Sequence, residues 1–131
     1  YFDYRAGRLE YRSLRFDTKV IDTPNFQGNA VVNYTSADVP YTRIIEHKHF
    51  EYGTQHKTVI TYEYPATWSE GLEPYYPVNN ERNNAIAAEY RQMARSMGNV
   101  IFGGRLGQYA YFDMDDTVDE ALKLAEKEMG N

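Results

Sequence analysis

The chain has 131 residues, enough for one domain with a hydrophobic core, and ordinary shares of hydrophobic (42%) and charged (25%) residues. Its formal net charge of −5 argues against binding to nucleic acid or to an anionic membrane, which both attract basic surfaces. Cysteine is absent, which excludes disulfides and thiolate metal sites, and no apolar run has the length of a membrane span. We therefore expect a cytoplasmic protein.

The first half of the chain is predicted to form strands. Residues 10–21 alternate between apolar and polar side chains, the pattern of a half-buried strand. Shorter strands are expected over residues 30–35, 42–50 and 57–64, and Pro65 is expected to end the last of them. Because the connections are short and rich in turn residues, an antiparallel sheet is favoured.

The next segment is a loop with two closely spaced prolines. In Pro74-Tyr75-Tyr76-Pro77, each proline fixes its own φ and restricts the residue before it. We expect the loop to hold Tyr75 and Tyr76 in defined positions. A packed loop is the alternative to a ligand-binding one.

The remaining residues predict a helix, a strand and a second helix. Asn79 or Asn80 is suited to cap a helix that ends near Met97. Residues 100–102 are predicted to be a short buried strand. Asp113 or Asp115 opens the last helix, whose spacing predicts a buried apolar face and an Asp119–Lys123 pair on the outer side. The residues of that face are Val118, Leu122, Ala125 and Met129.

The apolar run at residues 100–102 leads into Gly103, Gly104 and Arg105, and Tyr109 and Tyr111 follow. A strand, a glycine turn and a helix N-terminus together are suited to bind phosphate, and an arginine adds a planar cation. The G-x-G-x-x-G motif of dinucleotide-binding domains is absent. The chain also starts abruptly with aromatic residues, so we expect a piece of a longer enzyme.

Several strings in one order over the whole chain resemble the UDP-galactopyranose mutases, a family of bacterial flavoenzymes. They are Tyr1-Phe2-Asp3-Tyr4, Leu9-Glu10-Tyr11-Arg12-Ser13-Leu14, Asn25-Phe26-Gln27-Gly28-Asn29, Thr42-Arg43-Ile44-Ile45-Glu46-His47-Lys48, Glu73-Pro74-Tyr75-Tyr76-Pro77-Val78-Asn79, and the segment from Val100 through Met114-Asp115. The resemblance implies the interconversion of UDP-galactopyranose and UDP-galactofuranose on reduced FAD. In this reaction the flavin N5 attacks the anomeric carbon and UDP leaves and returns, so the cofactor carries the chemistry.

The resemblance also assigns roles to individual residues. Four would bind the substrate: Arg43, Tyr76 and Tyr111 would contact the diphosphate, and Arg12 would face the same cleft. Four would border FAD: Gly104, Arg105, Asp113 and Met114. No residue of this chain is implied as the catalytic nucleophile.

The expected fold is α+β: a mostly antiparallel sheet, followed by a helix-strand-helix segment that completes a flavin-binding domain in the parent protein. Residues 1–78 would belong to the substrate-binding sheet domain and residues 79–131 to the FAD domain. The family's dinucleotide motif, its uridine-binding part and its mobile loop are missing. We therefore expect this piece to be inactive, to lack FAD, and to self-associate through exposed apolar surface.

Three other interpretations remain open. The chain could be a non-catalytic module that binds a nucleotide-sugar or a glycan on its tyrosines. His47 and His49 share one strand face and lie near His56, but two imidazoles without a clear third ligand rarely hold a metal. Acidic pairs such as Glu70 and Glu73 would suit a glycosidase, although solvation explains loop acids more simply.

Overall fold

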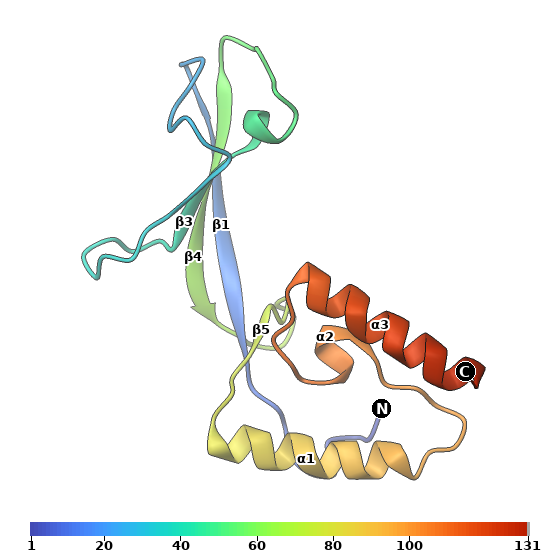
Figure 1. Cartoon of the computed structure of the whole chain (residues 1–131). Helices are drawn as coiled ribbons and strands as arrows, with labels where there is room; N and C mark the ends of the chain where they lie inside the picture. Colours follow the sequence, from blue (N-terminus) through green and yellow to red (C-terminus); the bar gives the residue numbers. More distant parts are fainter. Residues whose placement is uncertain (131) are drawn as a thin grey trace. The chain divides into compact units, whose positions relative to one another are not determined.

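The computed structural model describes residues 1–130 and has an α+β fold (Figure 1). The strands are β1 (Tyr11–Ile21), β2 (Val31–Asn33), β3 (Arg43–Glu46), β4 (Thr58–Thr67) and β5 (Tyr76–Pro77), in the sheet order β2-β3-β4-β1-β5. The helices are α1 (Glu81–Arg95), α2 (Gly104–Gly107) and α3 (Met114–Met129), with a 3-10 turn η1 (His47–Phe50). Among the described residues, no helix is both long and apolar enough to cross a membrane.

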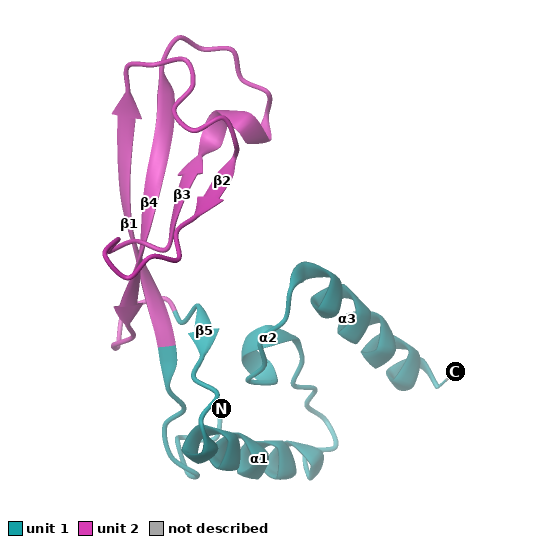
Figure 2. Cartoon of the chain, turned by 60° about the vertical axis from the view of Figure 1, so that its left-hand side comes forward, with its two compact units in different colours: residues 1–11, 74–131 teal, residues 12–73 magenta. Residues whose placement is uncertain are grey.

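The chain divides into two compact units (Figure 2). Unit 1 contains residues 1–11 and 74–131, and unit 2 contains residues 12–73. Unit 1 thus holds all three α-helices and β5, whereas unit 2 holds the four longer strands of the sheet. Unit 1 combines two segments that are distant in sequence, whereas unit 2 is one continuous segment, inserted between the two parts of unit 1.

Unit 2 is an antiparallel sheet built on a long hairpin-like pair, β1 and β4. Their register runs from Arg12 opposite Thr67 to Ile21 opposite Thr58, and β3 pairs with the other side of β4. The alternation predicted for residues 10–21 is therefore confirmed as strand β1. Because directly paired residues project to the same face, this register fixes which side chains share a face.

The core of unit 2 is small and partly polar. Ile44 and Ile60 are buried, with relative exposures of 2% and 0%. Instead of further aliphatic residues, a tyrosine group packs edge-to-face on the sheet, in the geometry that aromatic quadrupoles favour. Its members are Tyr34, Tyr41, Tyr62 and Tyr64.

Unit 1 is organised around α1. Asn80 caps this helix by accepting a hydrogen bond from the backbone N–H of Asn83, which confirms the expected cap. The side chain of Asn83 is fully buried and donates to Glu10 Oε2 at 2.9 Å. This bond ties the start of the helix to the segment that precedes β1.

Two of the predicted strands are different in the structure. Residues 42–50 form only the short strand β3 and then the turn η1. Strand β4 continues through Pro65 to Thr67, so the prediction that Pro65 ends it was wrong. Pairing with β3 stops at Glu63, and Pro65 therefore lies where β4 has β1 on one side only, an edge position that tolerates proline.

Residues 100–102 form no strand, contrary to the prediction. A short apolar run becomes a strand only when a neighbouring strand completes its hydrogen bonds, and Phe102 instead packs on aromatic rings. Its ring lies 5.3 Å from that of Phe2, nearly parallel, and 5.2 Å from that of Tyr1.

The last helix begins as expected but is not buried as expected. Asp113 caps α3, and Lys123 Nζ lies 2.7 Å from Asp119 Oδ2, so both the cap and the predicted ion pair are confirmed. The apolar face that was predicted to be core is exposed, however: Val118 is 59% and Leu122 60% exposed. Within unit 1, α3 contacts the segment before α2 through Leu124, whose side chain lies against Gly103.

Candidate functional site

Three of the predicted site residues converge in unit 1. The rings of Tyr76 and Tyr111 stack with their centroids 5.8 Å apart and their planes 22° apart. The guanidinium carbon of Arg105 lies 4.9 Å from each of these centroids. We call Arg105, Tyr76 and Tyr111 the stacked triad; it joins β5, α2 and the segment before α3.

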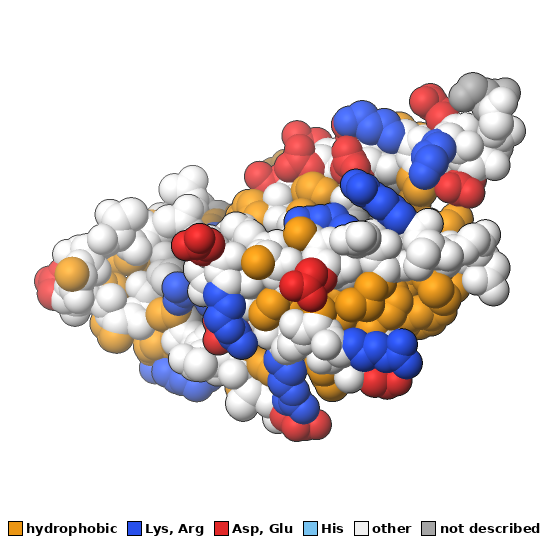
Figure 3. Space-filling model, turned by 90° about the horizontal axis from the view of Figure 1, so that it is seen from below, with side chains coloured by type: hydrophobic (Ala, Val, Ile, Leu, Met, Phe, Trp, Pro, Cys, Tyr) orange, Lys and Arg blue, Asp and Glu red, His pale blue; other side chains and the backbone are white. Residues whose placement is uncertain are grey.

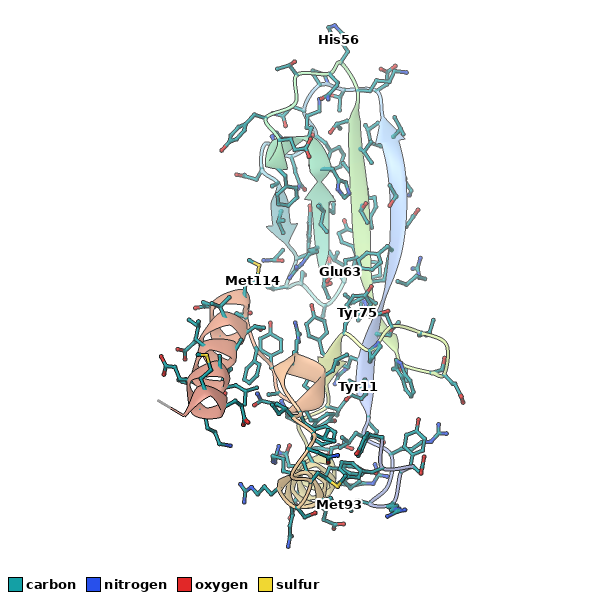
Figure 4. The ribbon with its side chains drawn as sticks, turned by 90° about the vertical axis from the view of Figure 1, so that its right-hand side faces the viewer. Tyr11, His56, Glu63, Tyr75, Met93 and Met114 are labelled. Carbon is teal, nitrogen blue, oxygen red and sulfur yellow. The ribbon has the colours of Figure 1, made fainter. Side chains whose placement is uncertain are left out.

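The backbone that carries Tyr76 is constrained. Tyr76 stands in β5 between Tyr75 and Pro77, and the N–H of Val78 donates to the carbonyl of Glu10 at 3.1 Å. Figure 4 shows Tyr75 and Tyr11 beside β5 and α2. A proline at the end of so short a strand limits the positions open to the tyrosine before it.

Arg105 has hydrogen-bond donors that the protein does not satisfy. Its Nε and Nη2 atoms are buried and have no acceptor among the described residues. A guanidinium carries five N–H donors and stays charged. Burying such donors without acceptors costs free energy, unless another molecule supplies the acceptors. An anion or a ring carbonyl placed beside the triad would satisfy them, and the residues present therefore fit a phosphate or a flavin.

The other three predicted cofactor residues lie near Arg105 in sequence but do not join the triad. Gly104 begins α2 with a φ of 73°, which a side chain would adopt only under strain. Asp113 caps α3, and its own N–H donates to Asp116 Oδ2 at 3.1 Å. Met114 is 89% exposed at the first position of α3 (Figure 4).

The predicted diphosphate ligand Arg43 belongs to unit 2. Its Nε lies 3.6 Å from Glu63 Oε1, an ion-pair distance too long for a hydrogen bond. The same oxygen of Glu63 accepts a shorter hydrogen bond from Thr42 Oγ1, at 2.9 Å. Arg43 is 38% exposed, so its guanidinium keeps donors for another acceptor.

The register places Arg12 on the same face of the sheet as Arg43. Arg43 is directly opposite Glu63, Glu63 is directly opposite Phe16 on β1, and Arg12 is four residues before Phe16. Since strand side chains alternate, residues an even number apart share a face. Arg12 is exposed there.

Glu46 is a buried charged residue that the sequence analysis did not single out as such. Its carboxylate is fully buried and accepts from the N–H groups of Phe26 and Gln27 at 3.0 and 2.9 Å and from Thr58 Oγ1 at 2.7 Å. Burial raises the pKa of Glu46, but these bonds and His49 outweigh it and lower the pKa to about 2. The sequence signal for this buried charge is an acidic residue that directly follows two isoleucines, in Ile44-Ile45-Glu46 at the end of β3.

Two of the three histidines lie close to other protein side chains. His47 Nε2 lies 2.8 Å from Thr61 Oγ1, and His49 Nε2 lies 3.1 Å from Glu46 Oε2. No group of three potential metal-binding side chains occurs in the part of the chain that the structure describes.

Comparison with known proteins identifies the family of the chain. The profile of the UDP-galactopyranose mutase family matches residues 1–111. The chain is 44% identical over 128 residues to a probable UDP-galactopyranose mutase of Klebsiella pneumoniae, and 36% identical over 132 residues to the UDP-galactopyranose mutase of Mycoplasma pneumoniae. It is also 39% identical over 127 residues to the dTDP-fucopyranose mutase of Escherichia coli.

These matches cover 97%, 96% and 96% of this chain, respectively, but only 33%, 33% and 34% of the relatives. The chain thus spans about a third of the length of the curated relatives it matches, and it corresponds to their C-terminal part. The family profile covers most of the chain, including the whole stacked triad. The chain therefore belongs to the UDP-galactopyranose mutase family.

Proposed function

We propose that this chain is the C-terminal part of an isomerase that interconverts UDP-galactopyranose and UDP-galactofuranose with the help of reduced FAD. The observation that carries the proposal is the stacked triad, in which Arg105 has two buried donors without an acceptor. A nucleotide-sugar diphosphate and a flavin both offer acceptors of the kind that these donors lack.

The residues of the chain would act by binding and positioning. The hydroxyls of Tyr76 and Tyr111 would donate hydrogen bonds to the diphosphate without adding charge, so that UDP is held and still released. Arg43 would add positive charge as the diphosphate departs, with Arg12 on the same sheet face. Arg105, with Gly104, Asp113 and Met114 beside it in sequence, would border FAD.

Reduced FAD, when bound, would supply the nucleophile for the anomeric carbon of the sugar. Positive charge and hydrogen-bond donors near the departing diphosphate lower the barrier only if they are already in place when the bond breaks. The constrained backbone around Tyr76 supports such preorganisation. We expect the isolated chain to be inactive, because the relatives' remaining two thirds would provide the rest of the site.

A non-catalytic module that binds a nucleotide-sugar is the second candidate, since a tyrosine pair with an arginine is also a binding platform. The two proposals differ in one measurable property. A mutase converts UDP-galactopyranose into the furanose only when FAD is reduced, whereas a binding module retains the sugar unchanged under both conditions.

The test uses the longer protein that we propose, comprising this chain and the additional segments of its relatives. The Arg43→Ala variant is expected to lose about a hundredfold in turnover while its flavin content stays normal. Arg15→Ala is the matched control, because Arg15 lies on the opposite face of the same sheet, with its guanidinium carbon 3.9 Å from the Tyr64 centroid. Near-normal turnover in Arg43→Ala would show that Arg43 does not act at the diphosphate. If the unmodified protein converts no sugar, the proposed mutase function is wrong.

A further inference from the structure

Tyr109 is the most buried tyrosine of the described residues, at 6% exposure, and its backbone lies in the left-handed region with a φ of 51°. A side chain in this region costs free energy and persists only where the surroundings hold it. Tyr4 and Tyr52 share such φ values, but they are 64% and 91% exposed. Tyr109 is therefore held by burial in a way that those two residues are not.

The strained backbone closes the turn between two members of the triad. The N–H of Tyr109 donates to the carbonyl of Leu106 at 3.2 Å, and the N–H of Ala110 donates to the carbonyl of Arg105 at 3.1 Å. These two bonds form a Schellman motif at the end of α2, where glycine normally occupies the position of Tyr109. The conformation of Tyr109 thus determines the path from Arg105 to Tyr111.

The side chain of the same residue holds the third member of the triad. The Tyr109 hydroxyl donates to the carbonyl of Glu10 at 2.5 Å and accepts from the N–H of Val78 at 3.1 Å. Val78 directly follows Tyr76-Pro77, and its N–H is shared between this hydroxyl and the carbonyl of Glu10, so the hydroxyl helps to hold the end of β5. The ring also packs edge-on against Tyr11, with centroids 5.3 Å apart.

We propose that Tyr109 is a positioning residue that holds Tyr76 in register with Arg105 and Tyr111. It acts through the two backbone segments that carry the residues of the triad. This inference rests on the proposed function for its catalytic consequence, but the geometric part can be tested without catalysis. Tyr109→Phe would keep the ring and remove both hydroxyl bonds.

The first test is the NMR signal of the Arg105 side chain in the 131-residue chain. The guanidinium carbon of Arg105 lies 4.9 Å from the centroids of two aromatic rings, so we expect its Nε proton upfield of those of exposed arginines; an Arg105→Lys variant assigns the signal by its loss. Tyr109→Phe should move this signal toward the exposed value. Tyr90→Phe is the matched control, because it also removes one hydroxyl that donates to a backbone carbonyl of unit 1, that of Gly7 at 2.6 Å. An unmoved Arg105 signal in Tyr109→Phe would overturn the proposal.

The second test measures turnover in the longer protein. Tyr109→Phe is expected to lower kcat about tenfold or more through misplacement of the triad, whereas Tyr90→Phe leaves it nearly unchanged. If Tyr109→Phe shifts the Arg105 signal but no protein converts the sugar, the positioning role stands and the proposed function fails. If the parent is active and the variant matches it in both signal and kcat, Tyr109 has no positioning role.

Amide hydrogen exchange in the unmodified chain provides an independent measure if Tyr109→Phe fails to fold. A hydroxyl that joins the two segments should make the amides of Val78 and Ala110 open together, with equal protection. Protection that differs by more than about tenfold between these amides would show that the segments open separately, and would contradict the proposal.

Discussion

At the residue scale, Glu46 shows how a single buried charge can organise a loop. Its carboxylate joins three parts of unit 2: β3, which carries it, the turn at Phe26 and Gln27, and Thr58 at the start of β4. A buried carboxylate is tolerated because backbone N–H groups, a hydroxyl and His49 surround it. The carboxylate thus fixes the backbone of this turn, together with the bond from Gln27 Nε2 to the carbonyl of Ile44 at 3.1 Å.

The Glu46→Gln variant is expected to lose about 2 kcal/mol of stability at pH 7, because the amide cannot accept all of these bonds and buries a donor without a partner. Urea unfolding at pH 7 measures the loss. Glu51→Gln is the control, since Glu51 is an exposed neighbour and should change stability by less than about 0.5 kcal/mol. Equal midpoints for the two variants would show that the carboxylate contributes nothing.

The same residue predicts a pH dependence of stability. The pKa of Glu46 is about 2 in the folded chain, below its usual value of 4.5. A lowered pKa means that the ionised carboxylate stabilises the fold above about pH 4.5 and that this contribution is lost as the pH falls through about 2. In urea unfolding series from pH 6 to pH 2, the parent should therefore lose more stability than Glu46→Gln, and parallel curves would contradict the assignment.

The members of the stacked triad were predicted individually, but their arrangement was not predictable. The roles of Tyr76, Arg105 and Tyr111 followed from resemblance, and the glycine turn also indicated Arg105 as an anion ligand. Their stacking depends on contacts that bring Tyr76 together with a segment far along the chain. The role of Tyr109 depends on such contacts as well, since its hydroxyl partners are 31 and 99 residues away. No local pattern in a sequence encodes a bond over that separation.

At the element scale, local signals predicted helix starts well and strands less well. Asn80 and Asp113 cap α1 and α3 as expected, because a cap depends on neighbouring residues alone. A strand depends on its neighbours in space. For this reason residues 100–102, apolar but without a partner strand, failed to form one, and β4 continued past Pro65.

The cap of α3 is reciprocal, since Asp113 and Asp116 each accept from the backbone N–H of the other. Asp113→Ala should therefore lower stability by about 1 kcal/mol and reduce the helical signal in circular dichroism as the first turn frays. Asp115→Ala is the control, because Asp115 lies in the same first turn outside the capping box and contributes only through the helix dipole, a few tenths of a kcal/mol. The cap is unimportant if both variants unfold at the same urea concentration.

At the scale of the whole molecule, many large hydrophobic side chains are exposed. Figure 3 shows one face, where hydrophobic side chains are exposed among charged ones. The clearest case is α3, on which every residue of one apolar face is exposed. Large exposed apolar patches are characteristic of interaction surfaces. The exposed residues of this face are Val118, Leu122, Ala125 and Met129.

We therefore expect the isolated chain to self-associate with rising concentration. Sedimentation velocity across a hundredfold range of concentration measures it, and Leu122→Lys should shift the distribution toward the monomer by placing a charge within the apolar face. Glu126→Gln is the matched control, because it raises the net charge of the same helix by one unit, as Leu122→Lys does, without removing apolar surface. If the parent stays a monomer over the whole range and unfolds at high temperature, the exposed face of α3 does not mediate self-association. If both variants dissociate the assembly equally, the association is electrostatic rather than hydrophobic.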